Sequence, residues 1–74
     1  MPTWRSGGYL FRIYQNDHPP LHVHVFKEGR LLDRYDLENG RFMDGTVGRH
    51  RGRVLAALSR IGLRSTSDDT NDQE

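Results

Sequence analysis

The sequence has no cysteine, a single lysine and no long apolar run. Without cysteine, disulfide bonds and thiolate zinc sites are excluded, and so are the small secreted proteins that disulfides hold together. No apolar segment approaches the roughly 20 residues that a membrane-spanning helix needs. No basic segment followed by an apolar one opens the chain, so a signal peptide is not indicated. We therefore expect a cytoplasmic protein that does not enter a membrane.

The chain has 74 residues, enough for one small domain. A core of this size leaves little net stability, so a protein partner, a metal ion or a homodimer could contribute to folding. Residues 65–74 contain four acidic residues and no apolar one. We predict a single domain over residues 1–64 and a disordered acidic tail over residues 65–74.

The basic residues are almost all arginines, ten of the 11 in total, and all of them precede residue 65. The planar guanidinium group suits phosphate and carboxylate recognition. No acidic residue occurs between Gly45 and Ser67, which makes that region basic. It predicts a nucleic-acid-binding surface, although a solvated helix surface would have the same composition. The candidate nucleic-acid-binding residues are Arg12, Arg49, Arg51, Arg53 and Arg60.

Apolar and polar residues alternate in four segments, which predicts β-strands within residues 3–14, 21–26, 31–37 and 41–44. After Gly45 the spacing becomes helical, with Val47, Val54, Leu58 and Ile61 on one stripe. Thr46 is the expected N-cap, and Gly62 and Leu63 fit a Schellman ending. The sequence therefore predicts an α+β fold: a four-stranded antiparallel meander with one C-terminal helix packed on the sheet.

Within the strands, the alternation also predicts which side chains share a face. Each strand is expected to carry one such set on a single face: Tyr9, Phe11 and Ile13 on the first, Leu21, Val23 and Val25 on the second, and Leu31, Tyr35 and Leu37 on the third. His22, His24 and Phe26 are expected on the opposite face from Val23 and Val25. Asn39-Gly40 predicts a type I′ hairpin turn.

The distinctive chemical feature is the segment Asp17-His18-Pro19-Pro20-Leu21-His22-Val23-His24. Residues two apart on a strand project from the same face, so His22 and His24 should lie together. His18 precedes the two prolines and could fold over that face, and Asp17 adds a carboxylate beside it.

Three interpretations of this cluster stay open. In the first, His22 and His24 act as general acid and base on RNA, with His18 and Asp17 orienting or assisting them and arginines holding the phosphate. Such a reaction needs no cofactor, because the 2′-hydroxyl can be the nucleophile. In the second, His18, His22 and His24 bind zinc or another divalent ion. In the third, the histidines are polar residues on a solvated sheet face or contact a protein partner.

The chain resembles a bacterial family known as domain of unknown function 4160. The resemblance is carried by Met1-Pro2-Thr3, Gly7-Gly8 and above all residues 17–25, and it continues through residues 36–40 and 43–45. Members typically have the signature Asp-His-x-Pro-Pro-His-x-His-Val after a first strand. In this chain the Pro-Pro pair is shifted by one position, as Pro19-Pro20-Leu21.

The resemblance implies a functional setting rather than a mechanism. Genes of the family often sit beside a gene for another small domain, an arrangement similar to a toxin–antitoxin operon. It implies a toxin-like protein that acts on RNA and pairs with a small antitoxin-like partner. The alternatives that remain are a non-catalytic module that binds protein or DNA, and a small metal-binding domain.

Overall fold

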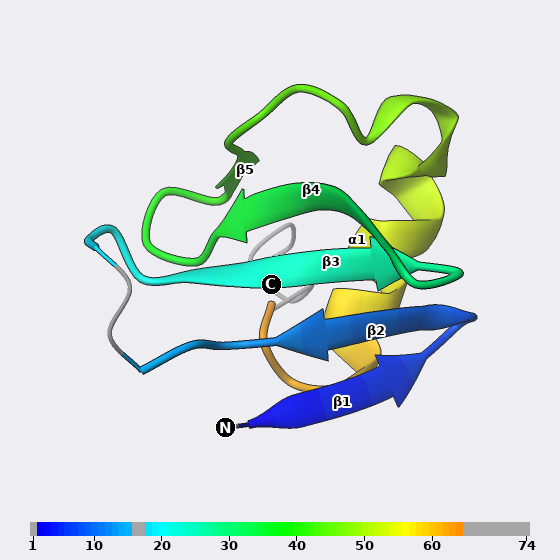
Figure 1. The fold of residues 1–74 in the computed structure, drawn as a ribbon, viewed down its shortest axis with the longest axis horizontal. Helices are drawn as coiled ribbons and strands as arrows, with labels where there is room; N and C mark the ends of the chain where they lie inside the picture. The colour runs from blue at the N-terminus through cyan, green and yellow to red at the C-terminus, as the bar shows by residue number, and fades with distance from the viewer. Residues whose placement is uncertain (1, 16–17, 65–74) are drawn as a thin grey trace, which may run out of the picture.

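The computed structural model describes residues 2–15 and 18–64, which form an antiparallel sheet and a C-terminal helix (Figure 1). The strands lie in chain order across the sheet: β1 (Thr3–Ser6), β2 (Tyr9–Arg12), β3 (His22–Lys27), β4 (Arg30–Asp36) and β5 (Arg41–Phe42). A 3₁₀ turn, η1 (Gly48–His50), leads into the helix α1 (Arg51–Arg60). The predicted α+β layout is confirmed, but the sheet has five strands rather than four. The predicted tail lies outside the described residues.

The additional strand is β1, which the sequence analysis merged with β2 into one segment. Gly7 and Gly8 separate the two strands and have φ angles of +61° and +86°. Two consecutive residues with positive φ form the tight turn that suits the twist of a hairpin. The turn pairs Ser6 with Tyr9 and Trp4 with Phe11.

The core lies between one face of the sheet and α1, where Phe11, Val23 and Val25 are fully buried. Burying each such side chain contributes about 1.5–3 kcal/mol. The burial of these residues confirms the predicted alternation in β2 and β3. The core residues are Tyr9, Phe11, Val23, Val25, Tyr35, Val47, Val54, Ala57 and Leu58. Among the residues that the structure describes, no second helix covers the opposite face of the sheet (Figure 1). The helix is also too short and too polar to cross a membrane.

Strand β4 departs from its predicted side-chain pattern at Leu31. The pairing of β3 with β4 shifts register between Val25 and Phe26, so Leu31 lies opposite Phe26. Leu31 is therefore on the uncovered face and half exposed, whereas Tyr35 is buried in the core. The predicted common face for Leu31 and Tyr35 is wrong because a bulge exchanges the two faces of a strand.

The turn between β4 and β5 spans residues 37–40 and is organised by Asp36. Its carboxylate accepts the backbone N–H groups of Glu38 and Asn39 at 2.8 and 2.9 Å, and the side-chain amide of Asn39 at 2.7 Å. The Asn39 side-chain bond is the main cause that lowers the pKa of Asp36. Gly40 has a φ of +70° but Asn39 has a negative φ, so the predicted type I′ turn at this pair is wrong.

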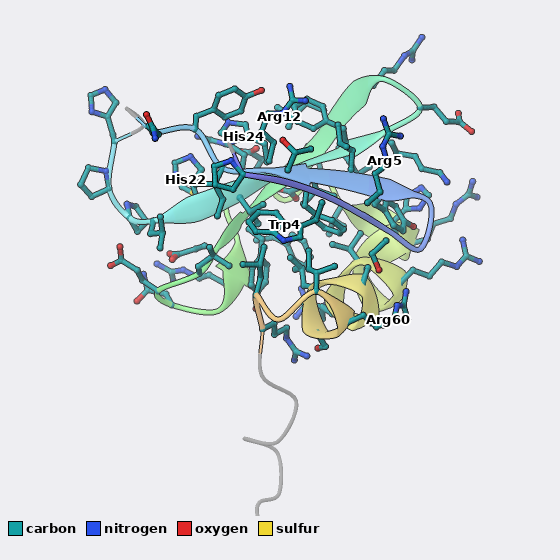
Figure 2. The ribbon with its side chains drawn as sticks, turned by 90° about the horizontal axis from the view of Figure 1, so that it is seen from below. Trp4, Arg5, Arg12, His22, His24 and Arg60 are labelled. Atoms are coloured by element: carbon teal, nitrogen blue, oxygen red, sulfur yellow. The ribbon has the colours of Figure 1, made fainter. Side chains whose placement is uncertain are left out.

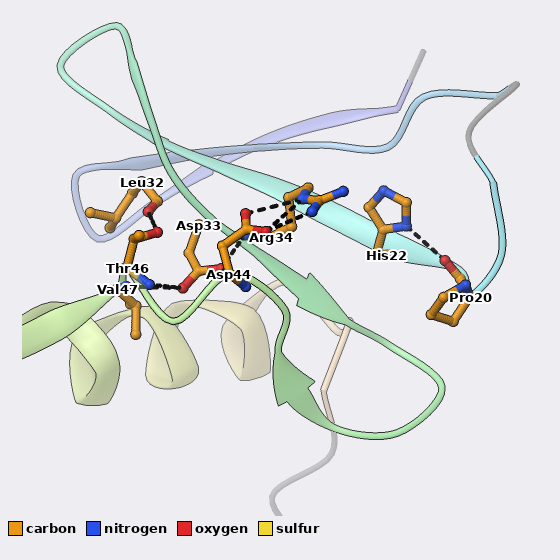
Figure 3. A network of polar contacts seen from close by, with 8 residues as sticks. All are labelled: Pro20, His22, Leu32, Asp33, Arg34, Asp44, Thr46 and Val47. Carbon is orange, nitrogen blue, oxygen red and sulfur yellow. Dashed lines mark hydrogen bonds and ion pairs between the residues drawn. The ribbon is translucent and has the colours of Figure 1, made fainter.

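The loop before the helix is held by the fully buried carboxylate of Asp33 on β4 (Figure 3). It accepts four backbone N–H groups at 2.6–2.9 Å, from Arg34, Asp44, Thr46 and Val47. These bonds satisfy the desolvated carboxylate and fix the loop that carries the chain from β5 to η1. The sequence analysis gave Asp33 no role.

The start of α1 differs from the prediction, whereas its end agrees with it. The hydroxyl of Thr46 donates to the carbonyl of Leu32 instead of capping a helix. The N-cap residue of α1 is His50, with no side-chain cap hydrogen bond. At the other end, Leu63 N–H bonds to the Leu58 carbonyl at 3.0 Å and Gly62 N–H to that of Ser59 at 3.1 Å. That pair of bonds is the predicted Schellman motif.

Candidate nucleic-acid interface

The uncovered face of the sheet carries the histidines of β3. His24 lies between Arg12 of β2 and Arg34 of β4 in the strand register. In Figure 2, His24, Arg12 and Arg5 point to the side of the sheet away from α1, whereas Trp4 lies on the helix side. We call this surface the open face; it is built from strand residues, so the sheet fixes the positions of its side chains.

His22 and His24 form a pair of neighbouring rings on the open face, as their spacing predicts. Their ring centroids are 5.1 Å apart. The edge of Tyr14 packs against His24 at 4.7 Å, and Phe26 stacks on its other side at 6.4 Å. The histidines therefore belong to a row of aromatic rings that runs along β3.

The ring of His22 is oriented by a backbone carbonyl. Its Nδ1 lies 2.7 Å from the carbonyl oxygen of Pro20 (Figure 3), and the residue is only 5% exposed. A carbonyl can only accept, so Nδ1 must carry a proton; whenever the ring is neutral, Nε2 is therefore its acceptor nitrogen. The orienting group is thus the Pro20 backbone; Asp17, the predicted candidate, lies outside the described residues.

The segment before β3 is fixed to the turn that follows β4. The carboxylate of Glu38 accepts the backbone N–H of Leu21 at 2.6 Å, and the N–H of Leu37 donates to the Leu21 carbonyl at 2.9 Å. These two bonds hold the chain on both sides of Leu21, between Pro20 and His22. The position of the His22 ring therefore depends on the hydrogen bonds between the segment before β3 and the turn after β4.

His18 is exposed and lines a cavity of about 240 Å³ together with His22, Tyr14 and Glu38. Within residues 2–15 and 18–64, no three histidine, aspartate or glutamate side chains are placed so that they could hold a metal ion. The structure therefore brings His18 to the same cavity as His22 but does not assemble His18, His22 and His24 into a set of ligands.

Arg34 is held beside His24 by Asp44, at the end of β5. Its Nε lies 3.0 and 3.2 Å from the two carboxylate oxygens, and a terminal nitrogen lies 2.6 Å from one of them (Figure 3). The Arg34 hydrogen bonds are the main cause that lowers the pKa of Asp44, with smaller contributions from the charges of Arg34, His24 and His22, against the opposing effect of burial. This two-point contact fixes a cation next to the histidine pair.

A larger cavity of about 560 Å³ lies on the open face, and two of its lining residues, Tyr14 and Phe26, contact His24. Tyr14 lines both this cavity and the smaller one. The lining residues are Arg5, Gly8, Tyr9, Leu10, Arg12, Tyr14, Phe26, Glu28 and Gly29. The sequence analysis missed Arg5 and Phe26 as site residues because Arg5 belongs to the strand it did not recognise and Phe26 carries no chemistry of its own.

The predicted arginine set is divided between two surfaces. Arg12 lies on the open face, where its Nε donates to the hydroxyl of Thr3 at 3.2 Å. Figure 2 shows Arg60 on the helix side of the sheet, where it donates to Ser6 at 3.3 Å. The remaining arginines, all exposed, belong to η1 and α1 on that same side: Arg49, Arg51 and Arg53. Of the predicted arginines, only Arg12 therefore shares a surface with the histidines, together with Arg5 and Arg34, which the sequence analysis did not single out.

Comparison with known proteins gives one match. A family model described as domain of unknown function, DUF4160, matches residues 8–61, which extend from the turn before β2 to the end of α1. No curated protein and no solved structure matches the chain.

Proposed function

Since the chain belongs to the DUF4160 family, whose name leaves its activity open, we propose that it is a toxin-like protein that cleaves single-stranded RNA on its open face. The proposal includes a cytoplasmic location and a small antitoxin-like partner protein. The observation that carries it is the His22–His24 pair, with ring centroids 5.1 Å apart, in which the nearly buried His22 lines the smaller cavity and Arg12 lies beside His24.

The proposed reaction uses the two imidazoles as base and acid. The neutral Nε2 of His22 takes the proton of a ribose 2′-hydroxyl, because Nδ1 is committed to Pro20. The 2′-oxygen then forms a bond to phosphorus while the bond from phosphorus to the 5′-oxygen breaks. His24, as an imidazolium, gives its proton to that leaving oxygen. The products are a 2′,3′-cyclic phosphate and a 5′-hydroxyl, and water restores the proton balance.

The arginines next to His24 have a separate role in this proposal. Arg12 and Arg34 lie on either side of it in the register, and both can face a bound phosphodiester. Negative charge builds up on the phosphoryl oxygens in the transition state, and preorganised cations stabilise it. Because Asp44 already pairs with Arg34 and offsets its charge, Arg34 contributes less to this stabilisation, and Arg12 makes the direct phosphate contact.

The test uses the full-length protein without a polyhistidine tag, a labelled single-stranded RNA and a chelator of divalent metals. We expect cleavage, with loss of activity by a factor of about 10²–10⁴ in His22→Ala and in His24→Ala. An RNA with a 2′-deoxy sugar at the cleaved position should resist. His50→Gln is the matched control: His50 bonds to Tyr9 on the helix side and should be replaced without loss of activity.

The same variants test the cellular role. Expression of the wild-type protein should slow growth, and His22→Ala and His24→Ala should relieve that effect at equal protein levels. Growth inhibition that persists in both variants contradicts the proposal. Cleavage that requires an added divalent ion also contradicts it, because the proposed chemistry takes no metal.

A further inference from the structure

The cleavage step leaves the larger cavity of the open face without a role. We propose that this cavity binds the nucleobase next to the scissile phosphate and that Glu28 makes guanine the preferred base. This inference rests on the proposed RNA substrate, because it names the nucleotide that the same face would accept. The cavity volume of about 560 Å³ lies within the usual range for small-molecule sites.

The cavity walls offer aromatic rings to a flat ligand. Phe26 of β3 and Tyr14, which follows β2, both line it. Stacking of a base on an aromatic side chain is the common way in which proteins hold single-stranded nucleic acids, and any base can use it. Leu10, which lies opposite Phe26 in the strand register, adds an apolar floor.

The charge of the cavity fits a nucleotide better than a free base. Arg5 and Arg12 line it from β1 and β2, two positions apart in the register of that hairpin. Guanidinium groups bind phosphate through two parallel hydrogen bonds. The two arginines would thus hold a phosphate while the aromatic rings hold the base.

Glu28 is the one acidic residue among the described residues that line this cavity. It is exposed and lies in the two-residue turn between β3 and β4, with a φ of +53°. A carboxylate only accepts hydrogen bonds. Guanine presents two adjacent donors, N1–H and the N2 amino group, and so can bind both carboxylate oxygens. Uracil presents a single N–H donor between two carbonyl oxygens, and these oxygens and a carboxylate repel each other.

Tyr14 connects the base cavity to the histidine pair. It lines the large cavity and packs edge-on against His24, with ring centroids 4.7 Å apart. A base that stacks on Tyr14 in the cavity would therefore lie next to the ring that contacts His24. The expected substrate is single-stranded RNA cut next to guanosine.

Binding of mononucleotides tests this inference without any cleavage. The probes are guanosine 3′-monophosphate, adenosine 3′-monophosphate and uridine 3′-monophosphate, titrated into the full chain by calorimetry. We expect the guanosine nucleotide to bind at least about tenfold more tightly than the uridine nucleotide. Glu28→Gln should remove that preference, and Phe26→Leu should weaken all three nucleotides while keeping an apolar side chain. Arg64→Gln, near the end of α1, is the control and should bind as the wild type does.

The outcomes separate this inference from the proposed function. Equal affinities for the three nucleotides, or a guanosine preference that survives Glu28→Gln, overturn the base cavity even if RNA is cleaved. Guanosine-selective binding in a protein that cleaves no RNA supports the cavity and overturns the nuclease. Loss of folding in Phe26→Leu is detected by thermal unfolding, and Glu28→Gln then decides alone, because residue 28 is exposed in a turn.

Discussion

The carboxylate of Asp33 accepts the backbone N–H of Val47 at 2.9 Å, which joins the middle of β4 to the first core residue of the helical region. Both residues are buried, and 13 residues separate them in the chain, including the β4–β5 turn and the loop after it. The bond therefore closes the chain segment that brings Asp44 to Arg34. The position of Arg34 on the open face therefore depends on how this loop is folded.

Replacing this carboxylate should destabilise the protein strongly. In Asp33→Asn, the new NH₂ group would face two of the four backbone N–H donors, which would lose their acceptor. Leaving buried donors unsatisfied costs about 1–3 kcal/mol each. We expect a loss of about 3 kcal/mol, or roughly 10–20 °C in the midpoint of thermal unfolding.

The same exchange at Asp44 is the control for this prediction. Asp44→Asn removes an ion pair whose two side chains are 36% and 26% exposed. Partly exposed pairs contribute about 1 kcal/mol or less. Equal shifts for the two variants would show that the Asp33 hydrogen bonds do not hold the loop.

The open face could be predicted from the sequence because period-two alternation fixes which residues share a face. His22, His24 and Phe26 followed from that pattern alone. The position of Leu31 could not be predicted in this way. It depends on a register shift after Val25, which arises from the pairing of two strands and is not visible in the local sequence. The sequence also gave no sign that Pro20 would orient His22.

The roles of Asp33 and Thr46 show the second limit of the sequence. Thr46 precedes a helical pattern and has the right side chain for an N-cap, but the Leu32 carbonyl takes its hydroxyl instead. A polar residue inside an apolar strand, such as Asp33, gives no indication of which distant N–H groups it will meet. Such contacts arise from tertiary packing, and they decide where the loop places Asp44.

Two glycine-to-alanine substitutions should change stability in opposite directions. Gly7 has a φ of +61°, and a Cβ atom there would lie 2.7 Å from Arg60 and 3.5 Å from the side chain of Ala57. An alanine in that conformation costs about 1–2 kcal/mol. Gly52 lies in α1, where an added Cβ would meet nothing within 4 Å. Gly52→Ala should stabilise the protein by roughly 0.5–1 kcal/mol because it removes the helix penalty of glycine.

Urea unfolding of the two alanine variants measures both effects on one scale. A stabilising Gly7→Ala would mean that the β1–β2 turn does not need its positive φ in solution. A destabilising Gly52→Ala would mean that the first turn of α1 is not helical.

Acidic pH should remove the stabilisation that Asp44 provides. The hydrogen bonds and charge of Arg34 lower the pKa of Asp44 below its ordinary value of 3.8. A carboxyl group with a lowered pKa in the folded state stabilises the protein above its unfolded pKa, and this contribution disappears as pH falls through the folded value. The stability difference between the wild type and Asp44→Asn should therefore shrink as the pH falls below about 4.

Thermal unfolding of both proteins at a series of pH values gives this difference directly. Asp36, whose pKa is also lowered, titrates in both proteins and cancels in the comparison. A difference that grows as the pH falls below about 4 would have the wrong sign and would contradict the Arg34–Asp44 contact.

The two basic surfaces can be distinguished by the salt dependence of RNA binding. Arg12 lies on the open face and Arg53 on α1, on the other side of the sheet. Each phosphate contact with a single strand contributes about 0.7 to the slope of log affinity against log salt concentration. Arg12→Gln should weaken binding of a 2′-O-methyl RNA and reduce that slope by about 0.7, whereas Arg53→Gln should change neither.

The 2′-O-methyl RNA keeps the phosphates but blocks the nucleophile, so binding is measured without cleavage. If Arg53→Gln lowers the slope and Arg12→Gln leaves it unchanged, the helix holds the RNA and the histidine pair lies on the wrong side of the sheet to act on it. The rings of His22 and His24 can reach a phosphodiester only from the open face, because β3 turns Val23 and Val25 toward the helix. The face that binds the backbone therefore decides whether the histidine pair can serve as the site of cleavage.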